Sequence, residues 1–319
     1  MTSRMGVGDI IEGGLTSPFS KDISEFAHEL MQIVLGDIYT ALYDSVQKSM
    51  KDLFNVLNYE VTKAAVRING GVQAWNEDAF DLVKNIAENV CIPIAAIFIT
   101  VVFCWELIHL VQESNNMNNA KPEKIMLVLM KFGLCLLVCA KSFDIIMGIS
   151  DLGAWASEQL GLLTSSELRS FEVDLSEMTG LVRQPPEYDL SMLMTLCGYK
   201  IVLFVGKIGI IICGAIVYIR VMIWFLEFLI YSSAAPIPYS TWVNKEWSQV
   251  GMNYTRKMLA LAFEGFFMLL LFAIYGGVIS GIASGDFMQN MVMVIGCGFA
   301  LCVMMFKTGN ISASIFNAH

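Results

Sequence analysis

The chain has 319 residues, of which 56% are hydrophobic and 15% are charged, and its mean hydropathy is +0.61. Soluble domains carry about 25% charged residues, so this composition excludes an ordinary soluble globule and favours a polytopic membrane protein. The formal net charge of -9 argues against a surface that binds nucleic acid tightly, because such a surface needs clustered basic residues to neutralise phosphates.

The first predicted element is a long N-terminal helix. Residues 1–21 mix glycine, serine, threonine and proline and are expected to be irregular, with no apolar stretch typical of a cleavable signal peptide. Over residues 22–57 apolar side chains recur every three or four positions, which indicates one face of an amphipathic helix too polar to cross a membrane. These positions are Ile23, Phe26, Leu30, Val34, Ile38, Leu42, Val46, Met50, Leu53 and Leu57.

The polar face of this helix is not rich in lysine or arginine, which favours a protein partner outside the membrane over the membrane surface. A break is expected at Asn69-Gly70-Gly71, followed by a shorter helix through Trp75 and Phe80.

Two membrane spans are predicted next. The first covers about residues 90–111 and includes Trp105, an aromatic residue of the kind that lies at membrane interfaces. The second covers about residues 125–149 and contains three charged residues, so its polar side cannot face lipid. They are Lys131, Lys141 and Asp144.

An acidic stretch and a long apolar stretch follow. Residues 150–190 hold eight acidic side chains against two arginines and are predicted to form a loop outside the membrane. Residues 190–235 are apolar over about 70 Å if helical, more than twice a hydrocarbon core of about 30 Å, so they are not one simple span. Pro236 and Pro238 end this stretch, because neither proline continues the hydrogen-bonded ladder of a helix. Two closing spans are predicted at residues 258–283 and 291–306.

The distribution of lysine and arginine near the span ends predicts the topology. Basic residues mark residues 112–124, residues 236–257 and the C-terminus as cytoplasmic, whereas the acidic loop has two arginines and the turn at Gly285 has none. We therefore expect an all-α bundle with five crossings, in which the stretch 190–235 crosses once and continues as an oblique or interfacial helix around Arg220. Six crossings, with both termini outside, are the alternative. The predicted regions are an outer N-terminal region (1–85), a first membrane pair (86–149), the outer acidic loop (150–190) and a C-terminal membrane region (191–319).

Charged residues inside the apolar stretches are the candidate functional residues. Lys200 and Lys207 are seven positions apart and therefore lie on nearly one helix face. Arg220 and Glu227 repeat this spacing, and Glu264 lies in the next span. Each charge costs roughly 2.5 to 3.5 kcal/mol at a helix centre, so we expect the five to face one another, another subunit or water. A polar seam or lumen is one interpretation, and snorkelling of long side chains to the interface is the other, which is favoured for Arg220.

A second group of candidate residues is small. Gly277, Gly281 and Gly285 follow one another in steps of four, a spacing that lets two helices approach closely. Packing within the chain is the favoured interpretation, and a contact between subunits is the other.

Motifs for catalysis or cofactor binding are absent from the sequence, and neither an enzyme nor a cofactor is expected. Glu106 and His109 are three positions apart and are able to share a proton, but contact with water and headgroups at the interface is favoured. Cys135 and Cys139 are four apart on a predicted helix, where packing is favoured over metal binding.

The order of these segments resembles the TrbL-like inner-membrane proteins of type IV secretion systems, particularly those of conjugative elements in Gram-positive bacteria. Two motifs carry the resemblance, the turn Ser232-Ser233-Ala234-Ala235-Pro236-Ile237-Pro238 and the stretch Trp242-Val243-Asn244-Lys245-Glu246-Trp247. It covers residues 85–306 and is strongest over residues 231–277.

This resemblance implies a non-enzymatic, homo-oligomeric subunit of a conjugation channel in the inner membrane. Such a channel passes a DNA strand with its attached relaxase, which the subunit contacts only transiently, and separate ATPases supply the energy. The resemblance implies that Pro236 and Pro238 face the cytoplasm, and that the N-terminal helix and acidic loop face outward toward other secretion components. A secondary transporter that uses Lys200, Lys207 and Glu264 as coupling charges, and a hole-forming membrane scaffold, stay open.

Overall fold

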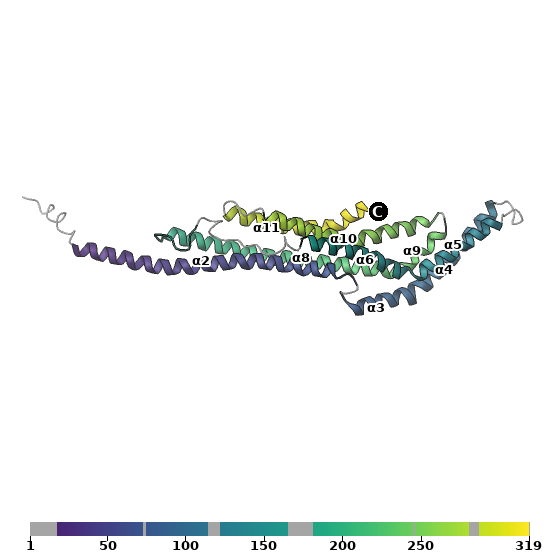
Figure 1. The fold of residues 1–319 in the computed structure, drawn as a ribbon, viewed down its shortest axis with the longest axis horizontal. Coiled ribbons are helices and arrows are strands. Elements are labelled where there is room, and N and C mark those ends of the chain that lie inside the picture. The colour runs from purple at the N-terminus through teal and green to yellow at the C-terminus, as the bar shows by residue number, and fades with distance from the viewer. Residues whose placement is uncertain are drawn as a thin grey trace, which may run out of the picture. The chain divides into compact units, whose positions relative to one another are not determined.

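The structure is a computed structural model that describes residues 18–72, 75–113, 122–164, 181–244, 246–280 and 287–318. Every regular element in these ranges is helical, which confirms the predicted all-α class (Figure 1). Within the described residues, four helical stretches are long and apolar enough to cross a membrane, or five if one bent pair is counted as a span.

The chain divides into two compact units. The first unit comprises Met1–Asn55, Phe171–Gly209 and Ile282–Met293. The second comprises Val56–Ser170, Ile210–Gly281 and Val294–His319. Three long helices contribute residues to both units, so the units are not separated at the ends of helices.

The N-terminal helix, α2 (Pro18–Asn69), is longer than the predicted range of residues 22–57. It ends at the predicted break, where Gly71 has a φ of +69°, a left-handed conformation that glycine adopts without steric cost. As predicted, α2 is not one of the described helices that are long and apolar enough to cross a membrane.

The apolar face predicted for α2 is covered along only part of its length. Val46, Met50 and Leu53 are fully buried, in agreement with the pattern. Nearer the N-terminus the same face is open, and four of its side chains are between 46% and 65% exposed: Phe26, Leu30, Val34 and Ile38.

In the first unit, the chain before helix α8 (Leu190–Ala234) lies along α2. The Gln32 side chain bonds twice to the backbone of Tyr188: its amide nitrogen donates to the carbonyl at 3.2 Å, and its oxygen accepts from the N–H at 2.9 Å. The Tyr39 hydroxyl donates to the Val182 carbonyl at 3.0 Å. Burial raises the pKa of Tyr39, because the ionised form would lose its solvation. Residues 181–189 are the last part of the predicted acidic loop, and hydrogen bonds thus hold them against α2.

We expect Gln32→Ala to remove both hydrogen bonds to Tyr188 and so loosen the contact of residues 181–189 with α2. Two hydrogen bonds at a partly buried site contribute about 1–3 kcal/mol, so amide hydrogen exchange over residues 181–189 should rise by roughly tenfold. Hydrogen exchange followed by mass spectrometry measures this change. Asp37→Ala, at an exposed position of the same helix, is the control and should leave the exchange unaltered. Equal exchange in the Gln32 variant and the unaltered protein would contradict the role given to this side chain.

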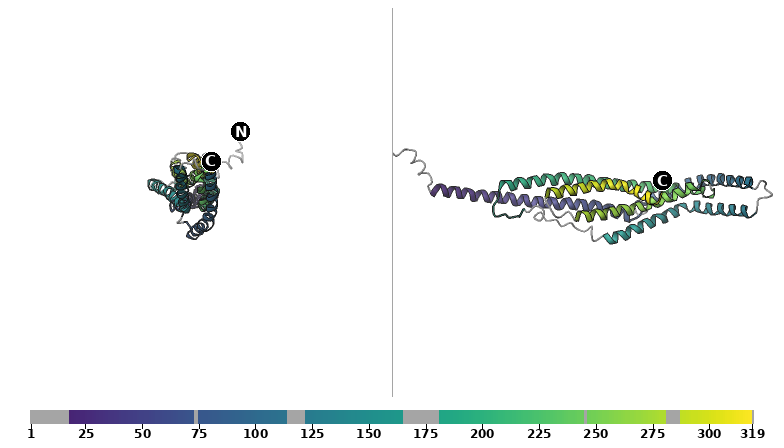
Figure 2. Two further views of the ribbon diagram at one scale, coloured as in Figure 1. Left: turned by 90° about the vertical axis from the view of Figure 1, so that its right-hand side faces the viewer. Right: turned by 90° about the horizontal axis from the view of Figure 1, so that it is seen from above.

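The second unit is built on three long helices, α8, α10 (Ser248–Ser280) and α11 (Phe287–Ile315), which lie side by side (Figures 1 and 2). The indole N–H of Trp224 donates to the Leu261 carbonyl at 2.8 Å, and the Tyr254 hydroxyl donates to the Tyr231 carbonyl at 2.6 Å. These contacts show that α8 and α10 are antiparallel. The thiol of Cys302 on α11 lies 3.5 Å from the Cys213 carbonyl, whereas Met305 reaches Arg220 farther along α8, so α11 is parallel to α8.

Helix α8 is continuous over 45 residues, from Leu190 to Ala234, and so covers the long apolar stretch except its last residue. The six-crossing alternative needs a second crossing within this stretch, and the described helices contain at most five candidate spans. That alternative is therefore wrong for this structure. The alternating directions of α8, α10 and α11 are those that the five-crossing topology requires.

The first predicted span is confirmed as a continuous helical stretch. Helix α3 (Glu77–Ile86) leads through a π-helical turn (Ala87–Cys91) into α4 (Ile92–Glu113), and Glu77–Gln112 is long and apolar enough to cross a membrane. The wider turn ends two residues before Pro93, which has no N–H to donate to the preceding turn.

The second predicted span is divided rather than straight. Helices α5 (Pro122–Ala140) and α6 (Ser142–Thr164) are bent by 64° at Lys141. The ammonium of Lys141 pairs with Asp144 at 3.1 Å, and both side chains are exposed. Both charges at the bend are therefore exposed on the surface of the helices rather than buried between them.

The predicted loop of residues 150–190 also begins later than expected. Residues 150–164 form the end of α6, because Gly153 packs directly on the backbone of α10 and holds this part of the chain in the bundle. Residues 165–180 lie outside the described residues.

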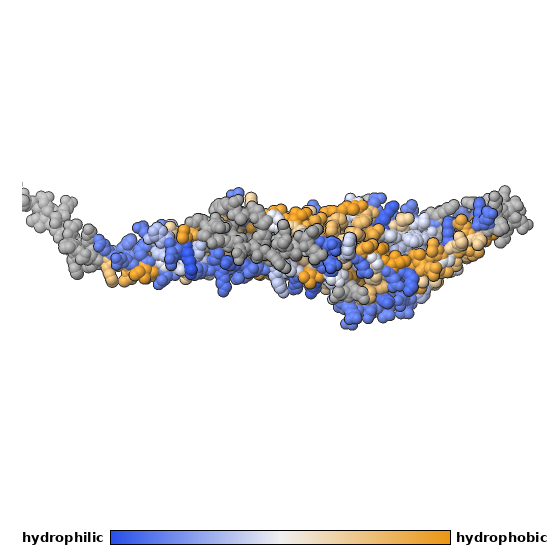
Figure 3. Space-filling view, in the orientation of Figure 1, coloured by the Kyte–Doolittle hydropathy of each residue, from blue (hydrophilic) through white to orange (hydrophobic). Residues whose placement is uncertain are grey.

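Helices α4 and α5 run side by side as a hairpin, and the rings of Phe103 and Phe132 lie 4.3 Å apart between them (Figure 2). The outer surfaces of α4 and α11 are hydrophobic (Figure 3). Residues that are between 45% and 68% exposed include Ile97, Phe98 and Val101 on α4, and Phe299, Val303 and Phe306 on α11. Such surfaces fit lipid better than water.

Candidate functional site: a buried ion pair among three helices

A buried ion pair joins α8 to α10 inside the second unit. The guanidinium of Arg220 contacts the carboxylate of Glu264, and the two side chains are only 8% and 3% exposed. The Nε of Arg220 also donates to the Met305 carbonyl of α11 at 3.2 Å. One arginine therefore holds all three helices at the same level.

The sequence around the ion pair lets α11 close over it. A Cβ atom at Gly309 would lie 3.0 Å from both the Arg220 Nη2 and the Glu264 Oε1 atoms. The absence of a side chain at this position therefore leaves space for the ion pair. The adjacent Thr308 hydroxyl is buried and donates to the Met305 carbonyl at 2.8 Å. One turn later, the buried Ser312 hydroxyl donates to a carbonyl of α10 at 2.5 Å. The polar groups of this layer satisfy one another, as a buried location demands.

This arrangement fixes the register of the three helices. An isolated charge in an apolar interior is costly, so a sliding or rotated helix would lose the pairing and pay that cost. Among the described residues, no group of three or more histidine, cysteine, aspartate or glutamate side chains is placed to hold a metal ion.

The structure corrects the location expected for Arg220 and shows the partner of Glu227. Arg220 does not extend to the surface of the bundle, because Glu264 and the Met305 carbonyl satisfy it in the interior. Glu227 pairs with Lys257 of α10 at 3.3 Å, and both side chains are about one-third exposed. Arg220 and Glu227 are seven positions apart on α8, and their partners Glu264 and Lys257 are seven positions apart on α10.

Lys200 and Lys207 belong to the first unit and face α2. The ammonium of Lys200 contacts the Ser45 hydroxyl, and that of Lys207 lies 3.8 Å from the Asp52 carboxylate. Lys207 and Asp52 are 39% and 45% exposed. Both lysines therefore lie along a partly open seam between two parallel helices.

The close helix contact predicted at the glycine series is not found at Gly277. Within the described residues, a Cβ atom at Gly277 would meet no heavy atom within 4 Å, and Gly281 and Gly285 lie outside the described residues. Close approaches occur at other glycines, including Gly153 and Gly265. A Cβ at Gly153 would overlap the Ala262 carbonyl, and one at Gly265 would lie 2.9 Å from Ile68. Isolated glycines have no sequence pattern, which is why these contacts were not predicted.

Pro236 and Pro238 end α8, as predicted, but they form a short helix, α9 (Pro236–Tyr239), instead of an open turn. Proline is tolerated in a first helical turn, where its missing N–H is not needed. The thiols of Cys139 and Cys135 on α5 reach the Pro236 and Tyr239 carbonyls at 3.6 Å and 3.2 Å. These cysteines therefore pack α5 against α9, in keeping with the favoured packing interpretation.

The comparison with protein families bears on the same helices. Residues 57–236 match the family described as TrbL/VirB6 plasmid conjugal transfer like protein. The match covers more than half of the chain, from the end of α2 to the first proline after α8. It stops near the start of residues 231–277, the range in which the motifs had indicated the strongest resemblance. No curated protein and no solved structure matches the chain. The helical membrane fold and the extent of this match show that the chain belongs to the TrbL/VirB6 family of plasmid conjugal transfer like proteins.

Proposed function

We propose that this protein is a non-enzymatic channel and scaffold subunit of a conjugative type IV secretion apparatus, and that several copies assemble in the cytoplasmic membrane. The family match over residues 57–236 carries this proposal, because members of the family are typically non-enzymatic secretion components. The motifs over residues 231–277 favour a conjugative element of a Gram-positive host within this family.

The filled interior between the long helices of the second unit supports an assembly of several copies. The Arg220–Glu264 pair occupies the centre of its three long helices, and two cavities beside Gly153 and Gly214 hold only about 10 Å³ each. A DNA strand with its relaxase needs a far wider passage. A channel would therefore be formed between subunits, with Lys200 and Lys207 as candidates for its lining.

The proposed orientation places the N-terminus outside and the C-terminus in the cytoplasm. The parallel directions of α8 and α11 support it, because both helices then end on the basic side, near Lys257 and Lys307. Helix α2 and the fastened residues 181–189 would be available outside to other secretion components.

Deleting the gene from a donor strain tests the proposal. Transfer of the conjugative element should fall to background while growth is unchanged, and a plasmid copy of the gene should restore transfer. Normal transfer from the deletion strain would contradict a role in conjugation.

The assembly is tested separately by cryo-EM of the full chain in mild detergent. A closed ring with a central opening lined by Lys200 or Lys207 is the expected result. A monomer or compact dimer with a cavity at the membrane midplane would contradict the channel and favour the secondary transporter.

A further inference from the structure

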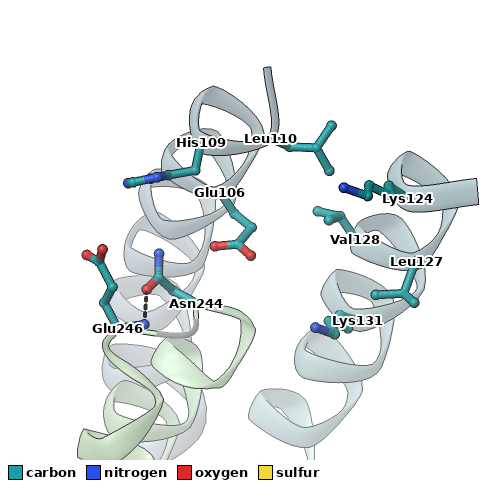
Figure 4. Close-up of a pocket in the computed structure, with 9 residues that line it drawn as sticks. All are labelled: Glu106, His109, Leu110, Lys124, Leu127, Val128, Lys131, Asn244 and Glu246. Carbon is teal, nitrogen blue, oxygen red and sulfur yellow. Dashed lines mark hydrogen bonds between the residues drawn. The ribbon is translucent and has the colours of Figure 1, made fainter. Parts of the chain in front are cut away.

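A second site lies in the hairpin of α4 and α5, away from the buried ion pair. A cavity of about 340 Å³ opens between these two helices and the segment after the 3₁₀ helix η3 (Ser240–Val243) (Figure 4). Its volume falls in the range of about 300–1,000 Å³ that small-molecule sites occupy. Six polar residues line it: Glu106, His109, Lys124, Lys131, Asn244 and Glu246.

The charges in the cavity are of both signs and come from different elements. Figure 4 shows the Glu106 carboxylate pointing from α4 into the gap and the Lys124 ammonium pointing toward α4 from α5. Lys131 follows Lys124 by seven positions and lines the same side of the gap. Among the described residues, no ion pair within 4 Å involves Glu106, Lys124, Lys131 or Glu246. The cavity thus presents two cations and two anions, and none of the four is ion-paired with another.

Asn244 adds a fixed hydrogen-bond donor to these charges. Its side chain is nearly buried, at 2% exposure, and its amide oxygen accepts the backbone N–H groups of Glu246 at 2.7 Å and Trp247 at 3.2 Å. Because the oxygen is occupied in this way, the NH₂ group is the part of the side chain that faces the cavity (Figure 4).

The surroundings place the cavity at the level where membrane meets water. It lies at the end of the candidate span Glu77–Gln112. Trp105, Trp242 and Trp247 are between 39% and 48% exposed near it, and tryptophan is enriched at membrane interfaces. The Trp105 ring lies 5.6 Å from the His109 ring, which lines the cavity.

We propose that this cavity binds the zwitterionic headgroup of a phospholipid that carries a primary amine, such as phosphatidylethanolamine. Lys124, Lys131 and the Asn244 amide would hold the phosphate, and Glu106 and Glu246 would hold the ammonium. The site depends only on the membrane location of the chain and not on its role in conjugation.

The two carboxylates define the class of lipid. A primary ammonium has three N–H donors for them, whereas the quaternary ammonium of phosphatidylcholine has none. A purely anionic lipid such as phosphatidylglycerol would satisfy the lysines and leave both carboxylates without a cation. The cavity therefore favours phosphatidylethanolamine over both.

Native mass spectrometry of the full chain in detergent tests this selectivity with three lipids of the same acyl chains. We expect phosphatidylethanolamine to bind at least tenfold more tightly than phosphatidylcholine or phosphatidylglycerol. Lys124→Gln combined with Lys131→Gln should remove this binding. Lys307→Gln, which neutralises an exposed lysine near the end of α11 and outside the cavity, should not.

Glu106→Gln provides a second readout that a folding defect would not imitate. This variant should still bind phosphatidylglycerol but lose the preference for phosphatidylethanolamine over it, while its melting temperature stays unchanged. Equal binding of phosphatidylethanolamine and phosphatidylcholine, or unaltered binding by the double lysine variant, would overturn the proposal. Binding of free phosphoethanolamine as tight as that of the lipid would also overturn it, because the site would then serve a soluble ligand.

Discussion

Arg220→Met is expected to destabilise the folded protein by about 3–5 kcal/mol, because it leaves the Glu264 carboxylate buried without its partner. Glu264→Met should cost a similar amount, since the guanidinium is then the unpaired charge. The combination of both substitutions should recover most of the loss, because two apolar side chains of similar size remove both desolvation penalties. Unfolding in detergent, followed by circular dichroism, measures the three differences.

The pair of Glu227 and Lys257 is the matched control for this experiment. It joins the same two helices, but its side chains are about one-third exposed. Breaking it by Lys257→Met should therefore cost no more than about 1 kcal/mol. A double variant at Arg220 and Glu264 that is as unstable as either single variant would contradict the role of the buried pair. Transfer assays on a stable double variant then show whether the charges act beyond folding.

Gly153→Ala is the second substitution with a large expected effect. The added methyl group would overlap the Ala262 carbonyl, which belongs to the backbone of α10 and cannot turn aside as a side chain can. Separating α6 from α10 to make room should cost about 1–3 kcal/mol, the usual cost of overpacking a tight contact. The melting temperature in detergent should fall accordingly.

Gly148→Ala, in the same helix, is the control for Gly153→Ala. A Cβ atom at Gly148 meets no described heavy atom within 4 Å, so nothing opposes the methyl group. Alanine is a better helix former than glycine, and this variant should be unchanged or more stable by about 0.5–1 kcal/mol. Equal melting temperatures for the two variants would show that α6 does not pack on α10 in this way.

Local chemistry was sufficient to predict the helical class, the first span and the ends of two helices. Apolar runs long enough for a membrane, the glycines after Asn69 and the prolines after Ala235 act within a few residues of themselves. No partner from a distant part of the chain is needed for these features, and the structure has each of them.

Contacts between segments far apart in the sequence determine which residues pair and where helices bend or approach closely, and sequence patterns did not show these features. Arg220 was expected at the interface because a lone arginine in an apolar helix extends toward water, and only the packing of α10 brings Glu264 to it from 44 positions away. The fastening of Tyr188 by Gln32 spans 156 positions and has no local signal. Neither the bend at Lys141 nor the approach at Gly153 belongs to a repeating pattern, because each depends on which surface the neighbouring helix presents. Hydropathy thus determined which segments are apolar helices, whereas tertiary packing decided which charges are buried and with which partner.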